Sequence, residues 1–184
     1  AFTTATPYQD YGRSHVPREM FKGRARETAN IVNPHGSYIV YGGRRLGKTA
    51  LLRHISRNRP EHGLFAYVDL VASSSAALWE RASGALKEAF AQPAATSEEF
   101  DQGVKAYLKG DERRRILLLL DEADSFLRNR QQAGHSWEVT QVNELLQQME
   151  MFDGLFICTT NLMDDVDEAA LRRFSFKIRF DPLT

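Results

Sequence analysis

The chain has 184 residues, of which 42% are hydrophobic and 26% charged, and its 24 basic residues balance its 24 acidic ones. This length and composition are typical of a soluble globular protein with one well-buried domain. The zero net charge provides no global basic field, so nucleic acid is not favoured as a partner. The apolar runs are far shorter than the roughly 18 residues that cross a bilayer, so we expect no membrane partner.

The single cysteine, Cys158, lies in the apolar run LFICTTN and cannot form an internal disulfide. We expect a buried thiol there, which fits a reducing compartment. The first residues lack a basic segment followed by an apolar one, which is the pattern of a secretory signal. These observations together predict a cytoplasmic protein.

In chain order, residues 1–20 show no helix or strand period and are predicted to form an extended arm before a core domain at 21–184. Short apolar runs then alternate with longer helical patterns. Strands are predicted at 37–41, 64–70, 115–121, 154–160 and 176–180. Helices are predicted at 49–57, 76–90, 98–109, 138–149 and 167–173. This alternation predicts an α/β fold, with a five-stranded, mostly parallel sheet and helices on both faces.

The glycine-rich segment GGRRLGKT follows the first predicted strand and opens a helix, as a phosphate-binding loop does. Its backbone amides and the helix N-terminus would hold phosphate, Lys48 would reach the β and γ oxygens, and the Thr49 hydroxyl would face Mg²⁺. Arg44 and Arg45 either contact phosphate or project into solvent. The predicted nucleotide-binding residues are Gly42, Gly43, Arg44, Arg45, Leu46, Gly47, Lys48, Thr49 and Ala50.

Acids and an amide follow two later strands, at the end where open α/β sheets bind ligands. In LLLLDEAD, Asp121 would hold the Mg²⁺ shell and Glu122 would activate the attacking water. We assign Asp124 to capping the next helix. Asn161, after the strand in GLFICTTN, would either bind water and γ-phosphate or serve as a turn residue.

A run of three arginines, Arg113 to Arg115, precedes the third predicted strand. We interpret it as a solvated strand entrance in preference to a nucleic-acid patch, because the chain as a whole is neutral.

The segments LLLLDEADSFLRNR, CTTN and DEAALRRF together resemble the AAA+ ATPases, particularly their AAA branch, over residues 21–180. The resemblance implies a P-loop NTPase core that uses ATP and Mg²⁺. It makes Lys48 and Thr49 Walker A residues, Asp121 and Glu122 the Walker B pair, and Asn161 the sensor 1 residue. It makes Arg173 an arginine finger acting on a neighbouring subunit. FKGR, at 21–24, is similar to the box near adenine in this family.

The chain departs from the AAA pattern at three places. Its loop is closer to that of signal-transduction ATPases with numerous domains and related archaeal-type ATPases. Ser175 and Phe176 stand where a second arginine is common, and Arg172 and Arg173 have surface ion pairs as an alternative role. The sequence ends where a small helical lid begins, so we expect no C-terminal lid in this chain.

The resemblance also places Trp79 where unfoldases of the family carry a substrate-gripping aromatic loop. The apolar helical spacing of Trp79 with Leu78 and Leu86 instead favours a core position. The sequence therefore predicts a catalytic set of Lys48, Glu122, Asn161 and Arg173, with Thr49 and Asp121 as metal ligands.

As a whole, the sequence predicts an Mg-ATP-hydrolysing module that acts at a subunit interface of a homo-oligomer and remodels a macromolecular partner that it does not identify. The alternatives are a nucleotide-gated signalling switch with low turnover and a nucleic-acid loader or helicase-type subunit.

Overall fold

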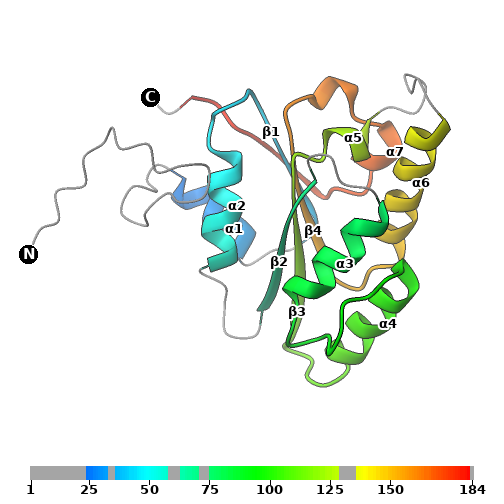
Figure 1. The fold of residues 1–184 in the computed structure, drawn as a ribbon. Coiled ribbons are helices and arrows are strands. Elements are labelled where there is room, and N and C mark those ends of the chain that lie inside the picture. The colour runs from blue at the N-terminus through cyan, green and yellow to red at the C-terminus, as the bar shows by residue number, and fades with distance from the viewer. Residues whose placement is uncertain (1–23, 33–35, 58–62, 71–74, 129–135, 183–184) are drawn as a thin grey trace, which may run out of the picture.

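The computed structural model describes residues 24–32, 36–57, 63–70, 75–128 and 136–182 (Figure 1). The predicted arm at 1–20 lies outside these residues. The elements are α1 (Ala25–Val32), β1 (Tyr38–Tyr41), α2 (Lys48–Arg57), β2 (Gly63–Asp69), α3 (Ser75–Ala85), α4 (Ser97–Leu108), β3 (Arg115–Asp121), α5 (Asp124–Leu127), α6 (Ser136–Met151), β4 (Leu155–Thr160), the 3-10 turn η3 (Met163–Asp165), α7 (Glu168–Leu171) and β5 (Phe176–Arg179).

The described strands form one five-stranded sheet in the order β2-β3-β4-β1-β5, and every pairing is parallel. The predicted α/β class and five-stranded sheet are therefore confirmed. In this order β4 lies between β1 and β3, so the segments that follow these three strands meet at one edge of the sheet. The register aligns Val40 of β1 with Thr159 of β4, and Cys158 of β4 with Leu120 of β3.

Helices cover both faces of the sheet (Figure 1). Side chains alternate along β3: Leu117 and Leu119 belong to the core cluster that includes α1 and α2, whereas Leu118 and Leu120 belong to the cluster under α3, α4 and α6. This period of two is what a strand buried on both faces requires, because successive side chains point to opposite sides. The nearly continuous leucine run of β3 thus serves two cores at once.

The structure has a shorter helix than the one predicted at 76–90, since α3 ends at Ala85 and not at Phe90. The Leu86 N–H is shared between the carbonyls of Ala82 and Ser83, which tightens the last turn. The Ser83 hydroxyl then accepts a hydrogen bond from the Ala94 N–H at 2.7 Å, and this contact fixes the return of the chain towards α4.

Trp79 and Cys158 lie in the core, as predicted. Trp79 is 2% exposed and its ring lies 5.3 Å from that of Phe100, so it serves packing between α3 and α4. Cys158 is fully buried in β4, and this burial raises the pKa of its thiol above the ordinary range. Among the described residues, no helix combines the length and apolar character needed to span a membrane.

Candidate functional site

The loop between β1 and α2 has a backbone that only glycine adopts easily at two of its positions. Gly42 has φ 144°, and a Cβ there would overlap the backbone carbonyl of Phe180 beyond β5. Gly47 has φ 94°, a conformation that strains other residues even though a Cβ would meet no atom within 4 Å. The predicted loop therefore has the conformation its glycines suggest, and residues 48–50 form the first turn of α2.

Arg44 and Arg45 are exposed within this loop, and Arg45 has the left-handed φ of 63°. Their exposure is compatible with both predicted roles, contact with phosphate and projection into solvent, because an exposed guanidinium beside the loop is available to either.

Lys48 begins α2 and directs its ammonium back into the loop. Its Nζ donates to the carbonyl oxygens of Gly42 at 2.7 Å and Gly43 at 2.8 Å, and to Oδ1 of Asn161 at 2.9 Å. The last contact joins the loop to the end of β4, 113 residues further along the chain. The structure therefore brings together the predicted lysine and the predicted amide.

Three carboxylates act on the same ammonium. Burial lowers the pKa of Lys48, while the negative charges of Asp124, Asp121 and Glu122 oppose that shift by favouring the charged form. We call Lys48, Asp121, Glu122, Asp124 and Asn161 the strand-end cluster. Its charges are concentrated where a phosphate-binding loop opens, at the carboxyl ends of β3 and β4.

Asp121 is 2% exposed, and both of its carboxylate oxygens accept hydrogen bonds. Oδ1 accepts from the Thr159 hydroxyl at 2.5 Å, and Oδ2 accepts from the Tyr67 hydroxyl at 2.8 Å. Burial raises the pKa of Tyr67, and the charge and hydrogen bond of Asp121 raise it further, against a smaller opposing effect of Arg53. Tyr67 therefore remains a hydrogen-bond donor at neutral pH. Tyr67 lies outside the motifs, and Thr159 stands in CTTN without a role of its own, so neither hydroxyl was predicted as a partner of Asp121.

Glu122 takes an unusual backbone conformation directly after β3. Its φ of 53° is left-handed, and its N–H donates to the Thr159 hydroxyl at 3.0 Å. The next N–H, of Ala123, donates to the Thr159 carbonyl at 2.9 Å. The chain thus turns sharply away from the strand, and the Glu122 side chain is exposed at the edge of the sheet where Lys48 lies.

The capping role predicted for Asp124 is wrong. The N-cap of α5 is Ala123, and no side chain caps that helix. The Asp124 carboxylate instead accepts from the Thr160 hydroxyl at 2.5 Å, the Asn161 N–H at 2.9 Å and the Asn161 Nδ2 at 3.1 Å. Three donors from the end of β4 outcompete the helix amides, and their effect is to aim Oδ1 of Asn161 at Lys48.

Arg173 follows α7 and makes contacts outside the strand-end cluster. It donates to the carbonyl of Ala169 at 2.5 Å and forms an ion pair with Glu150 near the end of α6. Its neighbour Arg172 pairs with Glu168 at 2.5 Å, and both of those side chains are largely exposed. Within this chain the two arginines make the ion pairs that were the alternative to a finger.

Arg24, the last residue of the FKGR box, anchors the start of α1 to the end of β5; residues 21–23 lie outside the described part of the chain. Its guanidinium lies 4.1 Å from the centre of the Phe180 ring and donates to the Asp181 carbonyl at 2.6 Å. Because Phe180 also abuts Gly42, Arg24 is linked to the phosphate loop through one intervening residue.

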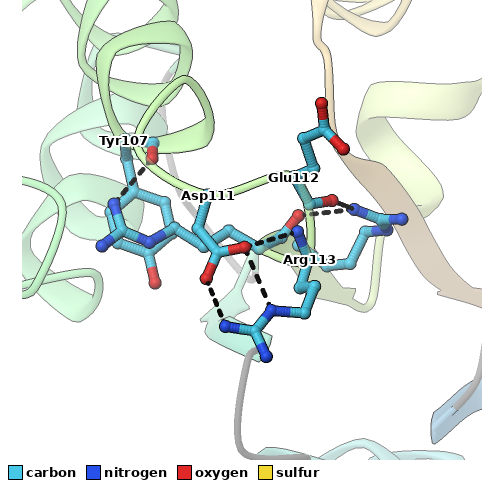
Figure 2. Close-up of polar contacts among 6 residues, drawn as sticks. Tyr107, Asp111, Glu112 and Arg113 are labelled. Atoms are coloured by element: carbon cyan, nitrogen blue, oxygen red, sulfur yellow. Dashed lines mark hydrogen bonds and ion pairs between the residues drawn. The ribbon is translucent and has the colours of Figure 1, made fainter.

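The arginine run lies at the opposite end of β3 from the strand-end cluster. Figure 2 shows the polar contacts around Asp111 and Arg113 at that end. Arg113 donates to the Asp111 carboxylate, Arg114 to the Tyr107 carbonyl, and Arg115 to the Glu112 carbonyl. Arg114 also stacks over the Tyr107 ring at 4.5 Å. These contacts agree with the interpretation of the run as a strand entrance.

Thr49 and Asp121 supply oxygen donors of the kind that Mg²⁺ prefers. The described residues hold no cluster of three or more His, Cys, Asp or Glu side chains suited to a metal. One carboxylate and one hydroxyl fit an ion that takes its remaining ligands from water and substrate phosphates, as Mg²⁺ does with nucleotides.

A parallel sheet with a glycine loop after its first strand, a lysine beginning the next helix and acids after a buried strand defines a P-loop nucleotide-binding protein of the α/β class. A family model described as ATPase family associated with various cellular activities (AAA) matches residues 38–182. The chain belongs to this family, as its motifs suggested, and the match supports nucleotide binding and hydrolysis of the ATPase type. A search of curated proteins found no match.

Proposed function

We propose that this chain binds Mg-ATP in the β1–α2 loop, hydrolyses it at an interface between identical subunits, and uses the cycle to remodel a macromolecular partner. The observation that supports this most directly is the position of Lys48. Its ammonium contacts two loop carbonyls and Asn161, and it experiences the charges of three carboxylates.

The residues divide the reaction between binding and proton transfer. Loop amides and the N-terminus of α2 would hold the phosphates, and the ammonium of Lys48 would exchange loop carbonyls for β and γ oxygens. Thr49 and Asp121 would hold Mg²⁺, which when bound neutralises phosphate charge. Glu122 would take the proton of the attacking water, and Asn161 would orient that water against the γ-phosphate.

The substitution Glu122→Gln tests this assignment. It keeps the size of the side chain but removes its basicity, so turnover should fall about a hundredfold, as expected for loss of a general base. ATP affinity, measured by calorimetry, should stay within about twofold, because binding relies on other groups. The matched control is Glu112→Gln, an exposed acid near the opposite end of β3.

Unchanged turnover in Glu122→Gln would remove Glu122 from catalysis. Tight ATP binding by the wild-type protein without cleavage, even in a single-turnover measurement at high protein concentration, would favour the low-turnover signalling switch.

Action at a subunit interface assigns Arg173 to the nucleotide of a neighbour. The phosphate charge of that neighbour would replace Glu150 as the partner of Arg173, and Glu150 is itself 60% exposed. Mixing Arg173→Ala with Lys48→Ala should give more ATPase activity than either variant alone, because some interfaces then combine an intact loop with an intact arginine.

Light scattering with and without ATP gives the mass of the assembly, and it shows at which concentration the subunits assemble so that the two variants can share an interface. Failure to recover activity at any mixing ratio, in a protein that does assemble, would contradict the role in trans.

A further inference from the structure

Thr159, at the carboxyl end of β4, contacts three consecutive residues that follow the core of β3. Its side chain is 1% exposed. The hydroxyl donates to Oδ1 of Asp121 at 2.5 Å and accepts the Glu122 N–H at 3.0 Å, and the carbonyl accepts the Ala123 N–H at 2.9 Å. One residue therefore bonds both members of the acid pair.

Strand register explains why these groups meet. Leu120 is aligned with Cys158, so the next residues along the two parallel strands are Asp121 and Thr159. Residues two positions earlier, Leu119 and Ile157, belong to the core cluster that includes α2. Because side chains alternate along a strand, Asp121 and Thr159 also face the α2 side, which is the side of the phosphate loop.

The conformation of Glu122 needs such support. A left-handed φ is unfavourable at a residue with a side chain, and it persists where neighbouring contacts determine it. The bonds to the hydroxyl and carbonyl of Thr159 flank the strained residue on both sides. Without the hydroxyl, the buried carboxylate of Asp121 and the N–H of Glu122 would each lose a partner.

Tyr67 completes the arrangement from the other neighbouring strand, β2. With Tyr67 on Oδ2 and Thr159 on Oδ1, the Asp121 carboxylate is fixed through both oxygens. Thr159 differs from Tyr67 because its hydroxyl acts on Glu122 as well.

We propose that Thr159 is a positioning residue for the ATPase site: its hydroxyl holds the metal-facing carboxylate of Asp121 and the backbone direction of Glu122 at the same time. This inference rests on the proposed function, which gives those two acids their roles. Thr159 itself touches neither nucleotide nor water in the reaction.

The test compares Thr159→Val, which removes the hydroxyl at nearly constant shape, with Thr159→Ser, which keeps it. The first readout is the ratio of ATP dissociation constants in EDTA and in Mg²⁺. Thr159→Val should reduce this ratio at least about threefold and leave the affinity in EDTA within about twofold. The second readout is hydrogen exchange of the Glu122 amide, which should speed up about tenfold or more when its acceptor is lost.

Turnover is the third readout and should fall about ten- to a hundredfold in Thr159→Val, with recovery to within about threefold in Thr159→Ser. Ser83→Ala is the control. It deletes another buried hydroxyl, which accepts the Ala94 N–H, and both residues lie far along the chain from Thr159. It should lower stability while leaving the Mg²⁺ ratio and turnover unchanged. If Thr159→Val does not fold, Thr159→Ala takes its place, because it also removes the hydroxyl.

An unchanged Mg²⁺ ratio together with an unchanged Glu122 amide in the hydroxyl-free variant would overturn the inference. So would a Thr159→Ser protein that behaves like Thr159→Val. A wild-type protein without turnover would instead count against the proposed hydrolysis, while the Mg²⁺ ratio and the amide exchange would still decide the role of Thr159.

Discussion

Charged side chains lie at both ends of β3, but their partners come from very different parts of the chain. At the amino end, Arg113 and Arg114 bind groups two and seven positions away (Figure 2). At the carboxyl end, Asp121 binds Thr159 and Tyr67, which are 38 and 54 positions away. The first set forms with one turn of the chain, whereas the second exists only when three strands pair in register.

This difference indicates where function depends on the whole fold. Groups held by local contacts keep their partners if the sheet shifts, and they are screened by solvent. Asp121 and Thr159, which bond each other across strands, are buried, so loss of one leaves a polar atom of the other unsatisfied. Matched substitutions at the two ends should therefore have unequal effects.

The largest effect is expected for Asp124→Asn. The carboxylate accepts three hydrogen bonds from Thr160 and Asn161, and an amide would place its NH₂ against one of those donors. We expect a loss of about 1–3 kcal/mol in the free energy of unfolding. Turnover should also fall, because Asn161 loses its orientation. Urea denaturation and a steady-state ATPase assay measure the two effects.

The matched control is Asp111→Asn at the other end of β3, where the same chemical change weakens an ion pair with Arg113. The Arg113 side chain of that pair is 71% exposed and the Asp111 side chain 29%, so solvent screens the pair and its loss should cost less than about 1 kcal/mol. Equal destabilisation by the two substitutions would contradict the contrast between local and cross-strand contacts.

The sequence was sufficient to predict the fold class, because the spacing of apolar residues within each short segment distinguishes strands from helices. Each strand of the sheet appeared as a short apolar run, and Leu117 to Leu120 identified a strand buried on both faces. Helix ends were less accurate, as α3 shows, because its end depends on a hydrogen bond between Ser83 and Ala94.

The candidate site was predicted only in part. The motif residues Lys48 and Asn161 do lie together, but the roles of Thr159, Tyr67 and Asp124 depend on which strands are neighbours. A hydroxyl within an apolar run carries no signal of its own, and an aspartate before a helix is most often a cap. The alternation of strands and helices does not reveal the order of the strands in the sheet, and that order determines the partners of both the hydroxyl and the aspartate.

A smaller effect is expected at alkaline pH from Tyr67. Its pKa is raised by burial, so the folded protein retains this proton at a pH where the unfolded chain releases it. The unfolded state then binds fewer protons, and stability must fall as pH rises above about 10. Tyr67→Phe has no such proton to lose. Between pH 9 and 10.5 its free energy of unfolding should therefore decline less than that of the wild type, and the difference should be below about 1 kcal/mol.

Urea denaturation of the two proteins at several pH values measures that difference, and absorbance of tyrosinate follows the ionisation itself. Parallel stability curves would show that the pKa of Tyr67 is not raised in the folded protein.

The smallest effect is expected for Arg113→Ala. Its side chain is 71% exposed and its partner lies two positions away, so the free energy of unfolding should change by less than about 0.5 kcal/mol. ATP affinity and turnover should be unchanged, because the run lies at the end of β3 away from the strand-end cluster. A titration with DNA or RNA at low salt provides the sharper measurement. Binding that weakens with salt and is lost in Arg113→Ala would mean that the arginines contact phosphates, and would revive the nucleic-acid function that the neutral charge disfavours.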